Sequence, residues 1–302
     1  MDHSIHLKYL AINPTDQLWG MTVNSVGHQS IEANAPYPPN NHPARYIFST
    51  DNGRILNEYQ LLYITKGSGR FYSQTTGCEQ AIPVKSGDMF LLFPGEWHNY
   101  MPDKGCGWDE FWIGFQGTHI DYWTKNSFFT QEKPLYNVGL NPEIVQLYRQ
   151  AIQVALEQKS GFQQVLSGIV NLLLGLAYFY DKNHLFETSE TVTQINRAKI
   201  MIADRFKEIS PKQIAEELNM SYSNFRKIFK EYTGFAPAQY IQEMKLSKAK
   251  ELLTHTTVPV KEIAYLMGFE NQEYFFTAFK KKNRVTPAEY RRMTQGRIKQ
   301  NA

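Results

Sequence analysis

Ten polar or charged side chains near the C-terminus lie at helical spacing, on the side opposite the apolar positions. They are Tyr222, Ser223, Arg226, Lys227 and Lys230 in one segment, and Gln272, Glu273, Thr277, Lys280 and Lys281 in another. Such amide, hydroxyl, guanidinium and ammonium groups bind base edges and phosphates in the major groove of DNA. The alternative is a pair of ordinary helical hairpins whose polar faces meet only solvent.

An internal repeat contains both segments. Gln213–Tyr240 and Glu262–Tyr290 share an Ile-Ala pair, a Phe-Lys pair and a Pro-Ala-x-Tyr run. The spacing from Phe to Tyr is 11 residues in both copies, whereas the spacing from Ile to Phe is 15 in the first copy and 16 in the second. A one-residue difference is best tolerated in a turn, so each copy is predicted to be a helix, a short turn and a second helix.

The residues around the turns fit this prediction. Ser221 and Asn271 are expected to cap the second helix of each copy, and Gly268 to end the helix before the second turn. Between the copies, Ala238–His255 contains no Pro or Gly. We therefore expect one long helix that holds the two polar faces apart, where about 34 Å would match one turn of DNA.

The charge of the chain is divided between its ends. Residues 194–302 hold 20 Lys+Arg and 11 Asp+Glu, a net charge of +9, whereas residues 1–193 hold 12 and 18, a net charge of −6. A basic module beside an acidic one favours a polyanion as the partner of the basic part. Double-stranded DNA matches both this charge and the side chains of the repeat.

The stretch from Ile195 to Arg292 resembles the DNA-binding domain of the AraC/XylS regulators. The resemblance is carried by Ile263-Ala264, Gly268-Phe269, Tyr274-Phe275, Phe279-Lys280-Lys281 and Thr286 to Arg291. It implies control of transcription, usually activation, with RNA polymerase as a partner. By the same resemblance, bases are contacted by Ser223, Arg226 and Lys227 and by Gln272, Glu273 and Thr277.

The first part of the chain predicts β structure followed by helices. Short runs of β-forming residues such as Tyr59–Thr65 and Met89–Phe93 are separated by glycine turns, which is typical of a sandwich or barrel. From Pro142 apolar residues recur every three or four positions, and a second apolar helix is predicted from Phe162 to Tyr180. The polar stretch Asn183–Thr193 is predicted to be a linker.

Gly87–His98 resembles a motif of the cupin barrel. Cupin enzymes use a His at this place with a His-x-His and a Glu on earlier strands to hold a metal. Tyr59–Tyr72 contains no His, so His98 would stand alone, and we expect no metal. The chain shows no nucleophile motif, phosphate loop or paired-carboxylate pattern, so we also expect no catalytic site and no cofactor. A cupin-type metalloenzyme fused to a DNA-binding module is the alternative, and a vestigial barrel that responds to a partner protein is a third interpretation.

The barrel more closely resembles the arabinose-binding domain of the same regulators, over Pro94–Tyr100 and Trp108–Phe115. This implies that Tyr100, Glu110 and Trp112 line a sugar pocket, although Glu110 replaces a His of the relative. His98 and Arg54 are further candidates for contacts with the effector. The alternatives are that Trp112 and Tyr100 are core aromatics and that Arg54 lies on the surface.

The remaining features concern assembly and location. Cys78 and Cys106 are expected to be free thiols in a reducing cytoplasm, and neither a signal peptide nor a membrane span is expected. The two helices after Pro142 resemble the family's dimerisation helices and imply a homodimer, or else they only pack on the barrel.

We therefore expect an α+β multidomain fold, with an N-terminal cupin-like β-barrel, two following helices and a C-terminal all-α double helix-turn-helix domain. The expected boundaries are an effector-binding domain over 1–140, dimerisation helices over 141–182, a linker over 183–193 and a DNA-binding domain over 194–302, with helix-turn-helix units at 213–232 and 262–282. The predicted function is a transcription regulator that responds to a small molecule, for which the resemblance implies a sugar or oligosaccharide.

Overall fold

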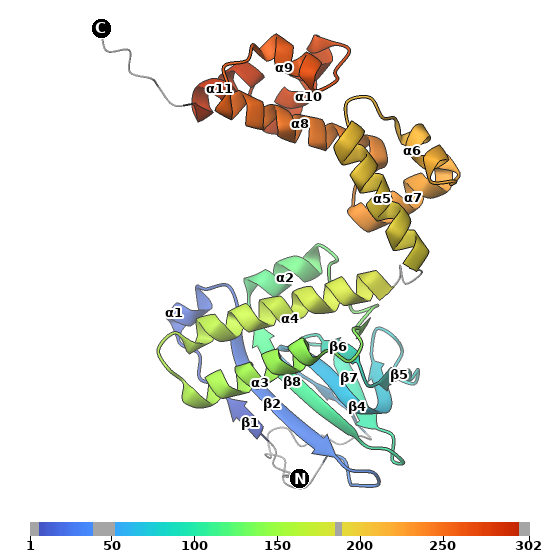
Figure 1. Cartoon of the computed structure of the whole chain (residues 1–302). Helices are drawn as coiled ribbons and strands as arrows, with labels where there is room; N and C mark the ends of the chain where they lie inside the picture. The colour runs from blue at the N-terminus through green and yellow to red at the C-terminus, as the bar shows by residue number, and fades with distance from the viewer. Residues whose placement is uncertain (1–5, 39–51, 185–188, 296–302) are drawn as a thin grey trace. The chain divides into compact units, whose positions relative to one another are not determined.

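A computed structural model describes residues 6–38, 52–184 and 189–295 (Figure 1). The chain divides into two compact units, Met1–Leu185 and Phe186–Ala302. The first contains all the strands and four helices, and the second contains only helices in the described residues. The predicted fold class, a cupin-like β domain followed by a helical helix-turn-helix domain, is confirmed.

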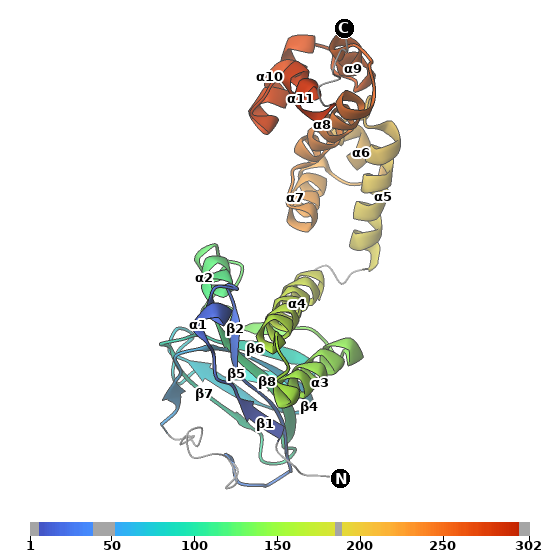
Figure 2. The ribbon, with the colours of Figure 1, turned by 90° about the vertical axis from the view of Figure 1, so that its left-hand side faces the viewer.

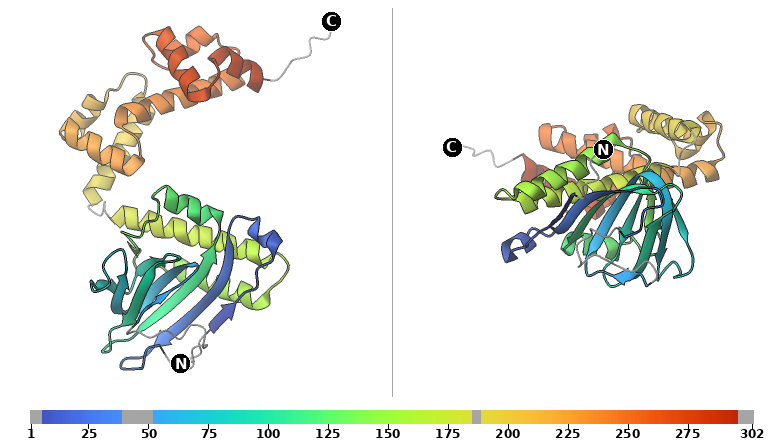
Figure 3. Two further views of the ribbon diagram at one scale, coloured as in Figure 1. Left: turned by 180° about the vertical axis from the view of Figure 1, so that it is seen from behind. Right: turned by 90° about the horizontal axis from the view of Figure 1, so that it is seen from below.

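The first unit is built on antiparallel strands that curve into an open barrel (Figure 3). The strands are β1 (His6–Tyr9), β2 (Thr22–Ile31), β3 (Arg54–Ile55), β4 (Tyr59–Ser73), β5 (Ile82–Lys85), β6 (Asp88–Leu92), β7 (Trp97–Pro102), β8 (Trp108–Gln116) and β9 (Leu135–Asn137). The start of β4 pairs with β6 and β8, whereas its end pairs with β5 and β7. This long strand therefore joins two sheets that face each other.

Successive side chains along each strand point to opposite faces of the sheet, and both faces are apolar. In β4, Leu62 and Ile64 point into the barrel with Phe90 of β6, whereas Leu61 and Tyr63 point outward. The outward residues pack against α3 (Pro142–Glu157) and α4 (Phe162–His184), which lie on one face of the sheet (Figure 2). Two short helices, α1 (Pro14–Gln17) and α2 (Thr118–Lys125), complete the unit.

Helix α4 is fixed to the sheet by polar as well as apolar contacts. The Gln163 side-chain amide accepts from the Val23 N–H and donates to the Val23 carbonyl, both at 2.9 Å, where β2 has a bulge. Over Phe162–Asn183 this helix is long and apolar enough to cross a membrane by length and composition alone. One side of that stretch packs against the sheet through Leu166, Val170 and Leu173, as in the core helix of a globular domain.

The second unit shows the repeat as two equal pairs of helices. Helices α6 (Pro211–Glu217) and α7 (Tyr222–Thr233) form the first pair, and α9 (Val260–Leu266) and α10 (Gln272–Asn283) form the second. The first pair is joined by residues 218–221 and the second by residues 267–271, so the extra residue lies in the turn, as predicted.

Three further helices hold the pairs together. They are α5 (Ser189–Arg205), α8 (Pro237–His255) and α11 (Pro287–Thr294), of which α8 is the predicted connector. The stretch expected as a linker, 183–193, is partly helical: α4 runs to His184 and α5 begins at Ser189. Residues 185–188 lie outside the described residues. The polar start of α5 is helical because the following turns of this helix are anchored in the core by the buried side chains of Ile195, Ala198 and Ile202.

Candidate functional sites

Helix α7 presents the first set of predicted DNA contacts. The Ser221 hydroxyl caps the helix by accepting from the Asn224 N–H, and Gly234 ends it in a left-handed conformation with φ of 78°. Phe225 and Phe229 are completely buried on the inner face. Because those positions are used for packing, the predicted contacts lie exposed on the other face: Tyr222, Ser223, Arg226, Lys227 and Lys230.

Helix α10 repeats this arrangement. The Asn271 carboxamide caps it by accepting from the N–H groups of Glu273 at 2.7 Å and Tyr274 at 3.4 Å. Phe275 and Phe279 are buried, so the outer face exposes Glu273, Thr277, Lys280 and Lys281, with Gln272 half-buried. Tyr274 is also exposed, at 57%, and was not among the predicted contacts, because an aromatic residue in an amphipathic helix favours the core.

Within the described residues, ion pairs are absent from the cations of these two faces. Among the described residues, no carboxylate forms an ion pair with Arg226, Lys227, Lys230, Lys280 or Lys281, whereas neighbouring Lys282 pairs with Glu243 at 2.9 Å. Such cations can bind DNA phosphates, and the exposed amide and hydroxyl groups beside them can bind base edges. The two equivalent helices therefore form a candidate DNA-binding face.

Inside the barrel, Arg54 links two of the predicted effector residues. Its guanidinium donates to the Tyr100 hydroxyl at 2.7 Å and from Nε to His98 Nε2 at 3.3 Å. Partly buried Arg54 lies next to Tyr100 and His98, because the two-residue strand β3 pairs Arg54 with His98 of β7. The other ring nitrogen of His98, Nδ1, lies 3.1 Å from the Glu96 carbonyl oxygen.

These contacts keep His98 neutral. Burial and the adjacent Arg54 charge lower the pKa of His98 to about 3, against a small opposing effect of the Glu96 carbonyl. In the neutral ring, Nδ1 donates to that carbonyl and Nε2 accepts from Arg54. Both nitrogens are therefore engaged in protein hydrogen bonds. In the part of the chain that the structure describes, no three His, Cys, Asp or Glu side chains come together as metal ligands would.

Glu110 is a buried carboxyl with unused hydrogen-bonding capacity. It is 4% exposed, and burial raises its pKa to about 8, although Arg54 opposes that shift. Its Oε2 atom has no hydrogen-bond partner among the described residues. By contrast, buried Glu58 accepts from Asn24 at 2.5 Å and from Gln60 at 3.4 Å.

Two neighbours of Glu110 share this property. Gln29 lies directly opposite Glu110 on β2, and its Oε1 atom also has no partner among the described residues. The Trp108 indole N–H favours the charged form of Glu110 but makes no well-aligned hydrogen bond to any described residue. A buried polar group without a partner costs about 1–3 kcal/mol, so three together indicate a place built for a ligand.

Aromatic rings lie beside these polar atoms. Trp112 and Tyr100 are buried at 6% and 5% exposure. Tyr37 packs edge-on against Trp108, with ring centroids 6.2 Å apart, and its hydroxyl is hydrogen-bonded to Tyr100. The structure thus brings Arg54, His98 and Tyr100 into one network. Glu110 and Trp112 lie on the same inward face of β8.

Sequence reasoning missed three residues of this interior: Gln29, Tyr37 and Trp108. Trp108 could have been predicted, because residues 108, 110 and 112 alternate along β8 and therefore lie on the same face as Glu110 and Trp112. Gln29 becomes visible only when the register of β2 on β8 is known. Tyr37 lies in a proline-rich segment without periodicity, and no local signal pointed to it.

Comparisons with known proteins match both units. A model described as a helix-turn-helix domain matches residues 214–293, and one described as an AraC-like ligand binding domain matches residues 44–174. The chain is 25% identical over 245 residues to the Msm operon regulatory protein of Streptococcus mutans, covering 80% of this chain and 86% of that protein.

Two further relatives are regulators of sugar operons by name. The raffinose operon transcriptional regulatory protein of Pediococcus pentosaceus is 26% identical over 254 residues, covering 82% of this chain and 88% of that protein. The lactose operon transcription activator of Staphylococcus xylosus is 24% identical over 243 residues, covering 80% and 86%. These relatives span both units of the chain.

Proposed function

Because the chain belongs to the AraC/XylS family of transcription regulators and combines a DNA-binding domain with a ligand-binding domain, we propose that it activates transcription as a homodimer when a sugar or oligosaccharide occupies its barrel. The named relatives are regulators, and the chain is likewise a regulator rather than an enzyme. The DNA contacts are assigned to the outer faces of α7 and α10.

One observation carries the sugar proposal: inside the aromatic-lined barrel, Gln29 and Glu110 face each other with oxygens that have no partner among the described residues. The Gln29 oxygen suits a hydroxyl donor, the protonated Glu110 carboxyl can both donate and accept, and the Trp108 N–H suits one acceptor oxygen. A sugar offers both on adjacent carbons, and its apolar face stacks on aromatic rings such as Trp112. The raffinose and lactose operon relatives point to the same class of ligand.

A melting screen of the full chain with mono-, di- and trisaccharides tests this proposal, because a ligand that binds only the folded state raises the melting temperature. The active saccharide is expected to lose its effect in Glu110→Leu, which removes both the donor and the acceptor, and in Trp112→Ala. Asp109→Asn is the matched control, since Asp109 lies on the outer face and accepts from Ser30. No response to any saccharide, or an unchanged response in Glu110→Leu, would refute the assignment.

The homodimer proposal rests on the exposed side of α4. Val165, Leu172 and Phe179 recur every seven residues and are 46%, 46% and 56% exposed. Gly168 and Gly175 lie between them, with open space where a side chain would be. A heptad repeat is the spacing of a helix–helix seam, and two antiparallel copies that cross at Leu172 would bring each glycine near a glycine of the partner.

Light scattering tests this assignment directly. Leu172→Lys is expected to convert a dimer into a monomer, because it places a charge at the centre of the seam. Leu140→Lys is the control: Leu140 is also exposed, at 64%, but precedes α3. A monomeric wild-type chain, or a dimer that persists in Leu172→Lys, would contradict the proposed seam. Recovery of the wild-type chain only in the membrane fraction would instead place α4 in a bilayer.

Activation implies contact with RNA polymerase and a location in the cytoplasm, where bacterial DNA lies. The two cysteines, Cys78 and Cys106, are free and exposed, which suits a reducing compartment. Transcription in vitro with purified polymerase tests the activator assignment. A transcript that increases on adding chain and saccharide supports activation, whereas a transcript that decreases would make the protein a repressor.

A further inference from the structure

The turn of the second helix-turn-helix pair touches the segment that leads into the first pair, away from the connecting helix α8. Gly268, in the turn between α9 and α10, lies against the segment between α5 and α6. A Cβ added at Gly268 would stand 2.5 Å from the Lys207 carbonyl oxygen, so only glycine allows this approach. Gly268 also has φ of 70°, a left-handed conformation that suits glycine.

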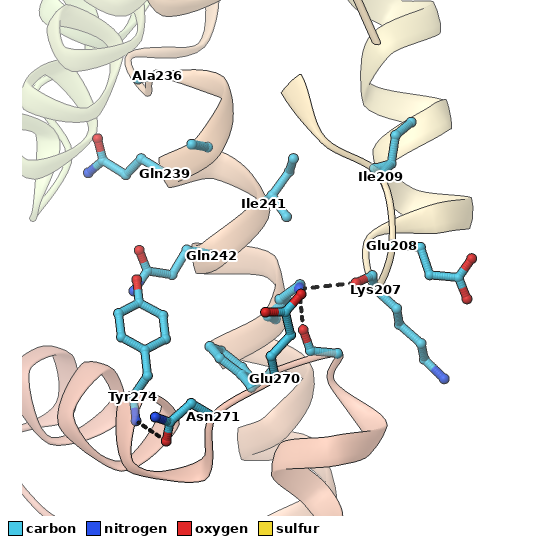
Figure 4. A pocket seen from close by; sticks show the side chains of 14 residues that line it. Lys207, Glu208, Ile209, Ala236, Gln239, Ile241, Gln242, Glu270, Asn271 and Tyr274 are labelled. Atoms are coloured by element: carbon cyan, nitrogen blue, oxygen red, sulfur yellow. Dashed lines mark hydrogen bonds between the residues drawn. The ribbon is translucent and has the colours of Figure 1, made fainter. Parts of the chain in front are cut away.

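Lys245 bridges this contact from the middle of α8. Its ammonium donates to the Gly268 carbonyl at 2.8 Å and to the Lys207 carbonyl at 3.2 Å (Figure 4). It also lies 5.4 Å from the centre of the Phe269 ring. Burial lowers the pKa of Lys245, while nearby Glu270 opposes the shift. One side chain thus joins the entry to the first pair, the connector and the turn of the second pair.

The hollow beside Lys245 suggests that its two hydrogen bonds limit the movement of one helix pair relative to the other. A hollow of 710 Å³ opens beside it, lined among others by Gln239, Gln242, Asn271 and Tyr274. On that side, open space rather than packed side chains separates α8 from the start of α10. With α8 as the other connection, the Lys245 bridge is a second attachment that resists rotation of one pair against the other.

We propose that Lys245 is a positioning residue that fixes the separation and angle of α7 and α10, and thereby the spacing between the two base sequences that this chain accepts in DNA. The inference rests on the proposed DNA contacts of both helices. Without the bridge, the two pairs move more freely. Changing the spacing in the DNA then lowers the affinity by a smaller factor, and DNA with the preferred spacing is bound less tightly.

The experiment begins with DNA that the full wild-type chain selects from a random pool. Affinity is then measured for the selected site and for versions with one base pair inserted or removed between its two halves. Each hydrogen bond is worth about 1 kcal/mol net, so loss of both in Lys245→Met should reduce the spacing penalty by up to about 30-fold. Lys245→Arg keeps a donor for both carbonyls and should retain the wild-type penalty.

Two controls separate this role from others. Lys250→Met removes a charge from the same helix without touching either carbonyl and should leave the penalty unchanged. If Lys245→Met loses helical circular dichroism, Lys245→Gln, which retains one donor group, is expected to fold and to show an intermediate penalty.

The remaining outcomes oppose the inference. If Lys245 were a phosphate contact, Lys245→Met would weaken binding equally at every spacing and lower the salt dependence by about one charge. An unchanged spacing penalty in both Lys245→Met and Lys245→Gln would also overturn it while leaving the DNA contacts intact. A wild-type chain that selects no two-part site would refute the proposed DNA contacts themselves, and this inference with them.

Discussion

Replacing Glu110 by Gln should change how the stability of the barrel depends on pH. The folded pKa is about 8, above the ordinary value of 4.5, because the carboxyl is buried. The native state therefore holds a proton that the unfolded state releases, and stability present at low pH is lost as pH rises towards 8. At about 1.4 kcal/mol per pKa unit, this loss amounts to about 3 kcal/mol between pH 5 and pH 8.

Urea unfolding followed by tryptophan fluorescence measures this effect in the full chain. All five tryptophans, Trp19, Trp97, Trp108, Trp112 and Trp123, belong to the first unit, so the signal reports that unit alone. The stability of Glu110→Gln relative to the wild type should rise steadily from pH 5 to pH 8. His98 titrates in both proteins and cancels in the difference. Parallel stability curves would show that Glu110 is ionised in the folded barrel and refute the reasoning.

Three further predictions concern DNA binding and the barrel. Arg226→Ala and Gln272→Ala should each cost about 1–3 kcal/mol of DNA-binding free energy and relax the preference for one base pair. Lys281→Ala should weaken binding to all DNA sequences about equally. An unchanged site preference in selection experiments would mean that other faces of the domain contact the DNA. Affinity for DNA should fall steeply as salt rises, because exposed, unpaired cations displace counterions, and a flat plot of log K against log salt would contradict this. Because His98 is neutral when folded, with its pKa at about 3, the barrel should lose stability as pH falls below about 6.5, and His98→Gln should lack that loss in the same urea assay.

The helical unit was predictable from sequence because its evidence is local. Periodicity, the caps Ser221 and Asn271 and the one-residue difference in the turns are all set by residues within a few positions of each other. The linker shows the limit of this reasoning. Polar residues from Ser189 to Thr193 resemble a loop until the burial of Ile195 and Ala198 makes them the first turn of α5.

The barrel interior was predictable only in part. Tyr100, Glu110 and Trp112 were identified by resemblance, and the structure places all three on the inside. The pairing of Gln29 with Glu110 joins residues far apart in the sequence and depends on the strand register. Arg54 meets His98 and Tyr100 for the same reason, since a two-residue strand carries too little pattern to be recognised alone.

The central claim is that a sugar in the barrel controls binding of DNA by the helical unit. The most direct test is the affinity of the full chain for its selected DNA, with and without the saccharide found by melting, together with the affinity for that saccharide with and without the DNA. Coupled sites change each other's affinity by the same factor, commonly about 5–150-fold. The account predicts two equal factors that differ from one and that vanish in Trp112→Ala. Equal affinities in all conditions would show that the barrel does not control DNA binding.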